Sequence, residues 1–138
     1  MLFRSDDTGL EVDALHGAPG VRSARFAGES ASYTDNNKKL LADMDGVSID
    51  KRTARFRCVV ALADENGLVE VVEGICNGAI LSEEKGGNGF GYDPLFQADG
   101  QVKSFGELSD AMKNRISHRA KALQKAWAAL SRYKRQRG

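Results

Sequence analysis

Cysteine, proline and aromatic residues are all scarce in this 138-residue sequence, and each scarcity excludes a class of protein. The two cysteines, Cys58 and Cys76, form no CxxC pair and have no histidine near them at metal-ligand spacing. This pattern excludes a disulfide-stapled domain and a structural zinc site, so we expect reduced thiols. With two prolines, 7% aromatic residues and no low-complexity tract, nothing indicates a disordered linker.

Long apolar runs are also missing. No stretch of about 18 apolar residues occurs, and the N-terminus lacks the basic, apolar and small-residue order of a signal peptide. We therefore expect a cytoplasmic protein. With 41% hydrophobic residues, residues 1–138 should form a single domain that buries a core without disulfides or metals.

Positive charge gathers at the C-terminal end, although the formal net charge is only +1. No acid follows Asp110. The lysines and arginines beyond it are Lys113, Arg115, Arg119, Lys121, Lys125, Arg132, Lys134, Arg135 and Arg137. Such a strip attracts the phosphates of a nucleotide or a nucleic acid. A solvated helix face, favoured by the helix dipole, is the alternative for the last four cations.

The first half of the chain predicts an extended segment, a turn and a helix. Leu10 and Val12 alternate with acids within 8–15, which indicates a strand. Residues 16–20 contain a Gly-Ala-Pro-Gly turn. We expect a helix over 34–45, with its N-cap supplied at Thr34.

An antiparallel hairpin follows. The alternation over 53–63 predicts a strand, the Asn-Gly pair within 64–67 predicts a tight turn, and 68–72 is the returning strand. We expect a third extended stretch over 74–81 after a kink. The glycines of 86–91 predict a loop.

The last segment predicts a helix capped by Ser117. Its apolar face comprises Ile116, Ala120, Leu123, Trp127 and Leu130. We expect Trp127 in the core. The expected fold is therefore an α/β domain, a mixed β-sheet with an antiparallel hairpin flanked by helices.

Three clusters are candidates for chemistry, each with a structural alternative. The Asp6-Asp7-Thr8-Gly9 stretch has the hard oxygen ligands that Mg²⁺ prefers, or is an ordinary turn. The loop ending in Phe90-Gly91-Tyr92-Asp93 admits a ligand to bare backbone and offers Tyr92 for stacking, or is a wide turn with Tyr92 in the core. Lys113 with Ser117-His118-Arg119 suits oxygen acceptors and phosphate, or is a polar helix surface.

Together these clusters resemble the inosine triphosphate pyrophosphatase family. The matching blocks are Asp6 to Leu10, His16 to Phe26, Gly89 to Phe96 and Lys113 to Arg119, in family order. The resemblance implies an enzyme that hydrolyses dITP, ITP and XTP to the monophosphate and pyrophosphate. It also implies a homodimer.

The resemblance assigns roles to individual residues. Asp7 would be the proton acceptor and a Mg²⁺ ligand, with Asp6 beside it and Thr8 contacting the triphosphate. Substrate binding would be shared by Phe90, Gly91, Tyr92, Asp93, Lys113, His118 and Arg119. Tyr92 would stack on the base, and donors from His118 and Arg119 would suit the 6-keto oxygen of hypoxanthine or xanthine.

Two family motifs are missing from this sequence: the N-terminal Ser/Thr-x-Asn-x-x-Lys phosphate-binding loop and a downstream metal-binding Glu. We therefore expect an ITPase-like domain without the family's N-terminal strand and helix, with residues 1–5 not native. Weak stability and low turnover of this chain alone are further expectations.

Two other functions stay open. In the first, the chain is a non-catalytic nucleotide-binding fragment that keeps the pocket without hydrolysis. In the second, the basic C-terminal helix binds nucleic acid. We rank nucleic-acid binding last, because no aromatic residues alternate with the cations to stack bases.

Overall fold

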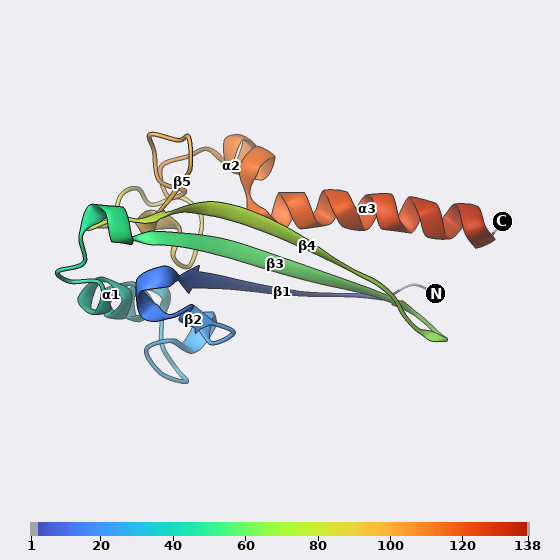
Figure 1. Cartoon of the computed structure of the whole chain (residues 1–138), viewed down its shortest axis with the longest axis horizontal. Helices are drawn as coiled ribbons and strands as arrows, with labels where there is room; N and C mark the ends of the chain where they lie inside the picture. Colours follow the sequence, from blue (N-terminus) through green and yellow to red (C-terminus); the bar gives the residue numbers. More distant parts are fainter. Residues whose placement is uncertain (1–2, 138) are drawn as a thin grey trace.

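The computed structural model describes residues 3–137, which form one antiparallel sheet and three α-helices (Figure 1). The sheet order is β2-β1-β3-β4-β5. The strands are β1 (Phe3–Val12), β2 (Pro19–Gly20), β3 (Thr53–Asp64), β4 (Gly67–Ile80) and β5 (Phe96–Ala98). The helices are α1 (Tyr33–Asp43), α2 (Asp110–Ile116) and α3 (His118–Arg137), with short 3-10 turns at Asp13–Leu15, Ser23–Arg25, Ile49–Lys51 and Asp93–Leu95. The predicted α/β class with its hairpin is confirmed, but all strand pairs of the described residues are antiparallel, so the sheet is not mixed as expected.

The predicted hairpin is the β3–β4 pair, in which Asp64 pairs with Gly67. Alternate residues of β3 are buried along its length, as the sequence pattern requires. On the other face, Arg57 forms ion pairs with Glu11 of β1 and Glu73 of β4. Strands β1, β3 and β4 thus form one long, half-buried ribbon (Figure 1).

Two strands differ from the predictions. Strand β1 begins at Phe3 rather than at Thr8 and ends at Val12, because its whole length pairs with β3. Strand β4 continues to Ile80 without the expected break, because Gly74 pairs in register with Cys58. The expectation of a separate third stretch over 74–81 was therefore wrong.

Helix α1 begins one residue earlier than predicted, and its N-cap is Ser32 rather than Thr34. The Ser32 hydroxyl accepts a hydrogen bond from the backbone N–H of Asp35, and the Asp35 carboxylate accepts one from the backbone N–H of Ser32. This capping box satisfies two backbone donors at the start of the helix.

The prediction for Trp127 was wrong, since its side chain is 70% exposed. Helix α3 buries a different face, made of Ala122, Ala126 and Ala129, against β3 and β4. Small side chains are needed there because the helix lies very close to β4. A Cβ atom on Gly74 would lie 2.0 Å from the backbone oxygen of His118.

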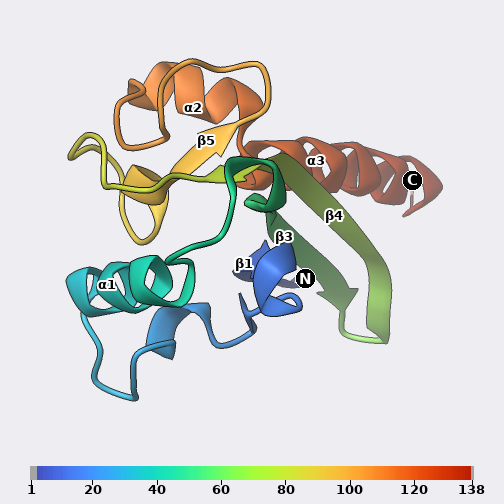
Figure 2. The ribbon, with the colours of Figure 1, turned by 60° about the vertical axis from the view of Figure 1, so that its left-hand side comes forward.

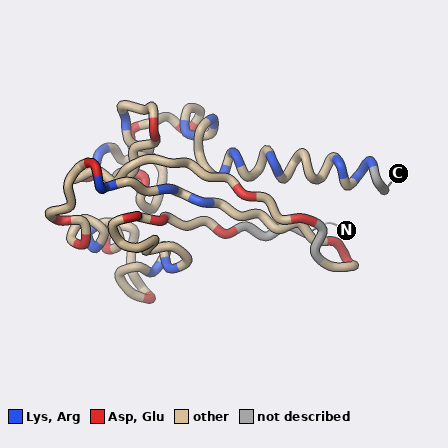
Figure 3. The backbone as a smooth tube through the Cα atoms, in the orientation of Figure 1, with Lys and Arg blue, Asp and Glu red and all other residues tan. Residues whose placement is uncertain are grey.

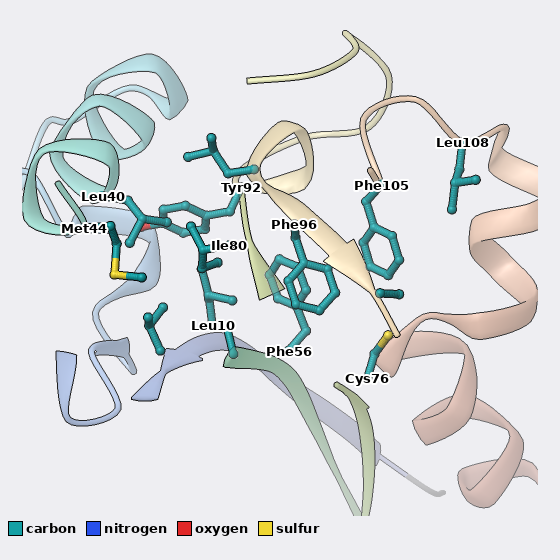
Figure 4. Close-up of a cluster of buried hydrophobic side chains, with 14 residues drawn as sticks. Leu10, Leu40, Met44, Phe56, Cys76, Ile80, Tyr92, Phe96, Phe105 and Leu108 are labelled. Carbon is teal, nitrogen blue, oxygen red and sulfur yellow. The ribbon is translucent and has the colours of Figure 1, made fainter. Parts of the chain in front are cut away.

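The larger of two core clusters lies between the sheet, α1 and the segment around β5 (Figure 4). Its aromatic centre is Phe56, whose ring lies 4.6 Å from that of Phe96 and 5.9 Å from that of Phe105. The second cluster lies beneath α3 and includes Cys58. Both cysteines are free and buried, which confirms the expected thiols.

Lysines and arginines recur along α3 (Figure 3), and several of them bind β4. The ammonium groups of Lys121 and Lys125 donate to the backbone oxygens of Ile75 and Glu73, at 3.1 and 2.7 Å. Arg132 pairs with Glu70 at 2.9 Å. The two lysine contacts satisfy carbonyls of a strand that β5 covers only from Gly78 to Ile80. Nowhere in residues 3–137 does a helix combine the length and apolar character required to cross a membrane.

The contact at Gly74 predicts a large effect of a single methyl group. We expect Gly74→Ala to lower the free energy of unfolding by about 1–3 kcal/mol, because α3 must move away from β4. Gly87→Ala is the matched control, since nothing lies within 4 Å of a Cβ atom built there. Urea unfolding of both variants checks this, and equal stabilities would contradict the tight packing of α3.

Candidate active site

Two adjoining cavities lie where β1, the loop before β5, α2 and the start of α3 meet. The inner cavity has a volume of about 220 Å³ and is mainly apolar. The outer cavity, of about 590 Å³, continues along the start of α3. Thr8, Phe90, Lys113 and His118 line both cavities. The arrangement provides an apolar recess beside a larger hollow, whose charged lining residues are Asp110, Lys113 and Arg119.

Most of the residues predicted from the sequence meet here. The inner cavity is lined by Thr8, Phe90, Gly91, Tyr92, Asp93, Lys113 and His118. Arg119 lines the outer cavity. Residues far apart in the sequence thus surround one space, although their separate roles stay predictions.

A buried ion pair joins the glycine loop to α2. The Lys113 ammonium lies 2.5 Å from Asp93 Oδ2, and the side chains are only 14% and 4% exposed. The same carboxylate oxygen accepts a hydrogen bond from the backbone N–H of Phe90, at 3.0 Å. Buried charges require partners of this kind, so Asp93 determines the position of both Lys113 and the Phe90 backbone.

Gly89 allows that carboxylate to approach the loop. Its φ of +77° lies in the left-handed region, and a Cβ atom there would lie 2.1 Å from Asp93 Oδ2. A side chain at this position would therefore be strained and would displace the carboxylate. The positive φ and the close approach of the carboxylate together explain why residue 89 is a glycine.

The Lys113 ammonium also lies over the Phe90 ring, 4.6 Å from its centroid. Attraction between a cation and an aromatic face stabilises such contacts. Phe90 is nevertheless 57% exposed. One face of its ring is therefore held near the lysine, while much of the side chain stays accessible at the cavity mouth.

Tyr92 is nearly fully buried and packs among the core residues (Figure 4). Its hydroxyl donates a 2.6 Å hydrogen bond to the backbone oxygen of Ser23. Burial raises the pKa of the phenol above its usual range. Tyr92 lines the inner cavity as well, so its predicted stacking on a base stays a prediction, but Phe90 presents the more exposed ring.

His118 forms part of the back wall. Its ring stacks on Phe56, with centroids 4.7 Å apart and an interplanar angle of 16°. Burial lowers the pKa of His118 to about 4, and the charges of Lys113 and Arg119 act in the same direction. The imidazole is therefore neutral near pH 7, with one N–H donor and one acceptor nitrogen. Its Nδ1 atom is buried and has no hydrogen-bond partner within the described chain.

Asp7 lies apart from this group. Side chains alternate along a strand, so Asp7 and Thr8 point to opposite faces of the sheet. The exposed side chain of Asp7 lies in a hollow of about 200 Å³ that Thr8, Glu11 and Arg57 also line. The side chain of Asp6 lies outside the described residues. Within the part of the chain that the structure describes, no group of three or more potential metal-binding side chains occurs.

Sequence reasoning missed the residues that α1 and the turn before it add to the site. Tyr33, Asn36 and Ser23 line the inner cavity. The Asn37 amide donates to the backbone oxygen of Gly91 at 3.1 Å, and α1 and α2 lie on either side of the loop before β5 (Figure 2). Two adjacent asparagines in a predicted helix were the available signal, because buried amides need partners.

His118 predicts a pH dependence of stability. Its folded pKa of about 4 lies below the ordinary value of 6.5, so between these values the unfolded chain binds a proton that the folded chain excludes. The free energy of unfolding should therefore fall as pH is lowered through this window, by on the order of 2 kcal/mol near pH 4.5. Urea unfolding at several pH values measures this.

His118→Phe is the control, because a phenyl ring keeps the contact with Phe56 but does not titrate. The difference in the free energy of unfolding between the unaltered chain and His118→Phe gives the contribution of His118 alone, because the carboxylates titrate in both proteins. If both proteins lose the same stability from pH 7 to 4.5, the histidine is not held neutral by the fold.

Comparison with known proteins identifies the family to which this chain belongs. The model of the Ham1 family matches residues 2–129. A dITP/XTP pyrophosphatase from Desulforamulus reducens is 59% identical over 131 residues, which are 95% of this chain and 65% of the relative. Another, from Elusimicrobium minutum, is 54% identical over 88% of this chain and 61% of its own length. The chain thus spans 61–65% of these curated relatives.

Solved structures agree with the sequence relatives. The Ham1 protein of Staphylococcus aureus matches with a TM-score of 0.89 and 39% identity, over 94% of this chain and 67% of that one. A HAM1 protein from Coxiella burnetii gives the same TM-score at 37% identity, over 96% and 68%. The described sheet and helices are therefore the arrangement that these proteins share.

Proposed function

Because this chain belongs to the Ham1 family, we propose that it acts in the hydrolysis of the non-standard purine nucleoside triphosphates dITP, ITP and XTP. The products are the nucleoside monophosphate and pyrophosphate. The observation that supports this most is the meeting of Thr8, the Phe90–Asp93 loop, Lys113 and His118 around one apolar recess, beside a larger hollow that Lys113 and Arg119 line together with Asp110. The recess suits a planar base and the hollow suits phosphates.

The base is selected by its hydrogen-bonding edge. A neutral His118 can donate from one ring nitrogen, and Arg119 always carries donors. Both suit the 6-keto oxygen of hypoxanthine or xanthine. Adenine places an amino group at that position, so buried donors would lose their acceptors, and mismatches of this kind discriminate strongly.

The phosphates extend from the recess past Thr8. Lys113 supplies positive charge on this path. The charge of Lys113 is partly balanced by Asp93, which keeps the ammonium in place rather than free to follow solvent. Lys113 thereby provides a fixed point charge near the junction of base and phosphates.

Asp7 would supply the base catalysis. In the described chain, Asp7 lies next to Thr8 on a stretch of β1 that pairs with β3 alone, so its carboxylate is accessible from the strand edge. The Asp7 carboxylate takes a proton from water, the water oxygen bonds to the α-phosphorus, and the bond to the bridging oxygen breaks as pyrophosphate leaves.

The donor set fits Mg²⁺ held by few protein ligands. Mg²⁺ usually keeps several waters and binds one or two carboxylates together with substrate phosphates, and Asp7 would provide one such carboxylate. When bound, the ion neutralises phosphate charge.

A nucleotide-binding protein without hydrolysis is the second candidate, because the recess is formed while Asp7 lies on the other face of β1. Nucleic-acid binding has less support, since Lys121, Lys125 and Arg132 are engaged with β4. A homodimer, which the resemblance implies, belongs to the same proposal.

Pyrophosphate release tests the proposal. We expect Mg²⁺-dependent release from dITP but not from dATP, and loss of release in Asp7→Asn by about 100-fold or more, in the range found for a general base. Binding of ITP is measured in parallel in EDTA, where Asp7→Asn should bind like the unaltered chain.

The combinations of outcomes separate the candidates. Release from dITP that is lost in Asp7→Asn supports the hydrolase. Binding of ITP without release from dITP supports the binding protein. Absence of both would contradict the proposed function of this chain.

A further inference from the structure

Two exposed aromatic rings stand at the mouth of the inner cavity. Tyr33 and Phe90 line the cavity, yet they are 58% and 57% exposed. Their ring centroids are 6.5 Å apart and the rings are tilted by 39°. This separation is at the upper end of the range for aromatic pairs, so the rings touch loosely and much of each side chain stays accessible.

Tyr33 is held at this place by the start of α1. It is the first residue of the helix, directly after the Ser32 N-cap, and the capping box determines the direction of the first turn. One turn later, the Asn37 side chain donates to the backbone oxygen of Gly91. Residues one turn apart lie on the same helix face, so this face of α1 is bonded to the turn that bears Phe90.

The exposure of Tyr33 requires an explanation other than core packing. A tyrosine that only stabilised α1 would bury its ring, as Tyr92 does at 5% exposure. Tyr33 instead contacts another exposed ring over a mainly apolar recess. An exposed aromatic pair above such a recess is suited to a flat, aromatic ligand.

We propose that Tyr33 is a base-contacting residue, which with Phe90 forms an aromatic mouth that closes on the purine held in the inner cavity. The inference rests on the proposed function, since it assigns a further residue to the same site. Stacking depends on the π-face that every base has and does not depend on the 6-substituent. Tyr33 therefore contributes affinity for the base, while His118 and Arg119 discriminate among bases.

Stacking on the base predicts that the effect of Tyr33 depends on the ligand. Tyr33 should contribute to the affinity for a nucleotide but not to the affinity for a phosphate chain without a base. A purely structural role would weaken both, because the shared walls at Thr8 and Lys113 would move together. Comparison of ITP with inorganic tripolyphosphate distinguishes the two roles.

The test is calorimetric titration of ITP and tripolyphosphate, in EDTA so that no divalent cation supports turnover. We expect Tyr33→Ala to weaken ITP binding at least about 5-fold, in the range found when aromatic residues that stack on bases are truncated. Tyr33→Phe, which keeps the ring, should bind ITP within about 2-fold of the unaltered chain. Tripolyphosphate should bind all three proteins equally.

Trp127→Ala is the matched control, since Trp127 is another exposed aromatic residue, on the far part of α3 and outside the cavity lining. It should leave ITP binding unchanged. Unchanged ITP binding by Tyr33→Ala, or an equal loss for tripolyphosphate, would overturn the inference. If the unaltered chain binds no ITP, the proposed function fails and the inference fails with it; the unaltered chain thus reports on the function and the variants on Tyr33.

Discussion

The site depends most on the buried ion pair between Asp93 and Lys113. The loop over residues 86–91 contains four glycines and has no regular structure to hold it, so its conformation must be imposed from outside. Asp93 does this with one oxygen, which binds the Lys113 ammonium and the Phe90 backbone N–H. Because a buried charge without its partner is very costly, either residue requires the other. This one carboxylate oxygen therefore holds Phe90 and Lys113 beside each other.

The other walls are held in place by close packing. Gly74 lets the start of α3 rest directly on β4, which brings His118 against Phe56. From the opposite side, Asn37 of α1 binds the Gly91 carbonyl. The recess is thus enclosed by three elements that are distant in sequence. Rigid elements of this kind position binding groups better than loops do, and they here also support the glycine loop.

Sequence patterns predicted those parts of the fold that depend on interactions between residues close in sequence. The alternation over β3 and the Asn-Gly turn gave the hairpin, and the motif blocks gave most of the cavity lining. Trp127 was misplaced because helical periodicity shows that apolar residues share a face but not which of two faces the sheet accepts; the contact at Gly74 selects the alanines. Tyr33 was missed because its role depends on a neighbour distant in sequence, Phe90. The sequence did not predict that Asp7 and Thr8 point to opposite faces, because the predicted strand began at Thr8 and so did not include Asp7.

The most direct test of this account is amide hydrogen exchange, followed by NMR, in the unaltered chain and in Lys113→Met. Breaking a buried pair costs about 3–5 kcal/mol, so exchange of the Phe90 amide should accelerate by roughly 100-fold or more. The amide of Val60, in the β3 core, is the reference for overall stability, because amides of core strands exchange through global unfolding. Unchanged exchange at Phe90 in the variant would show that the loop does not depend on the ion pair, and would contradict the account.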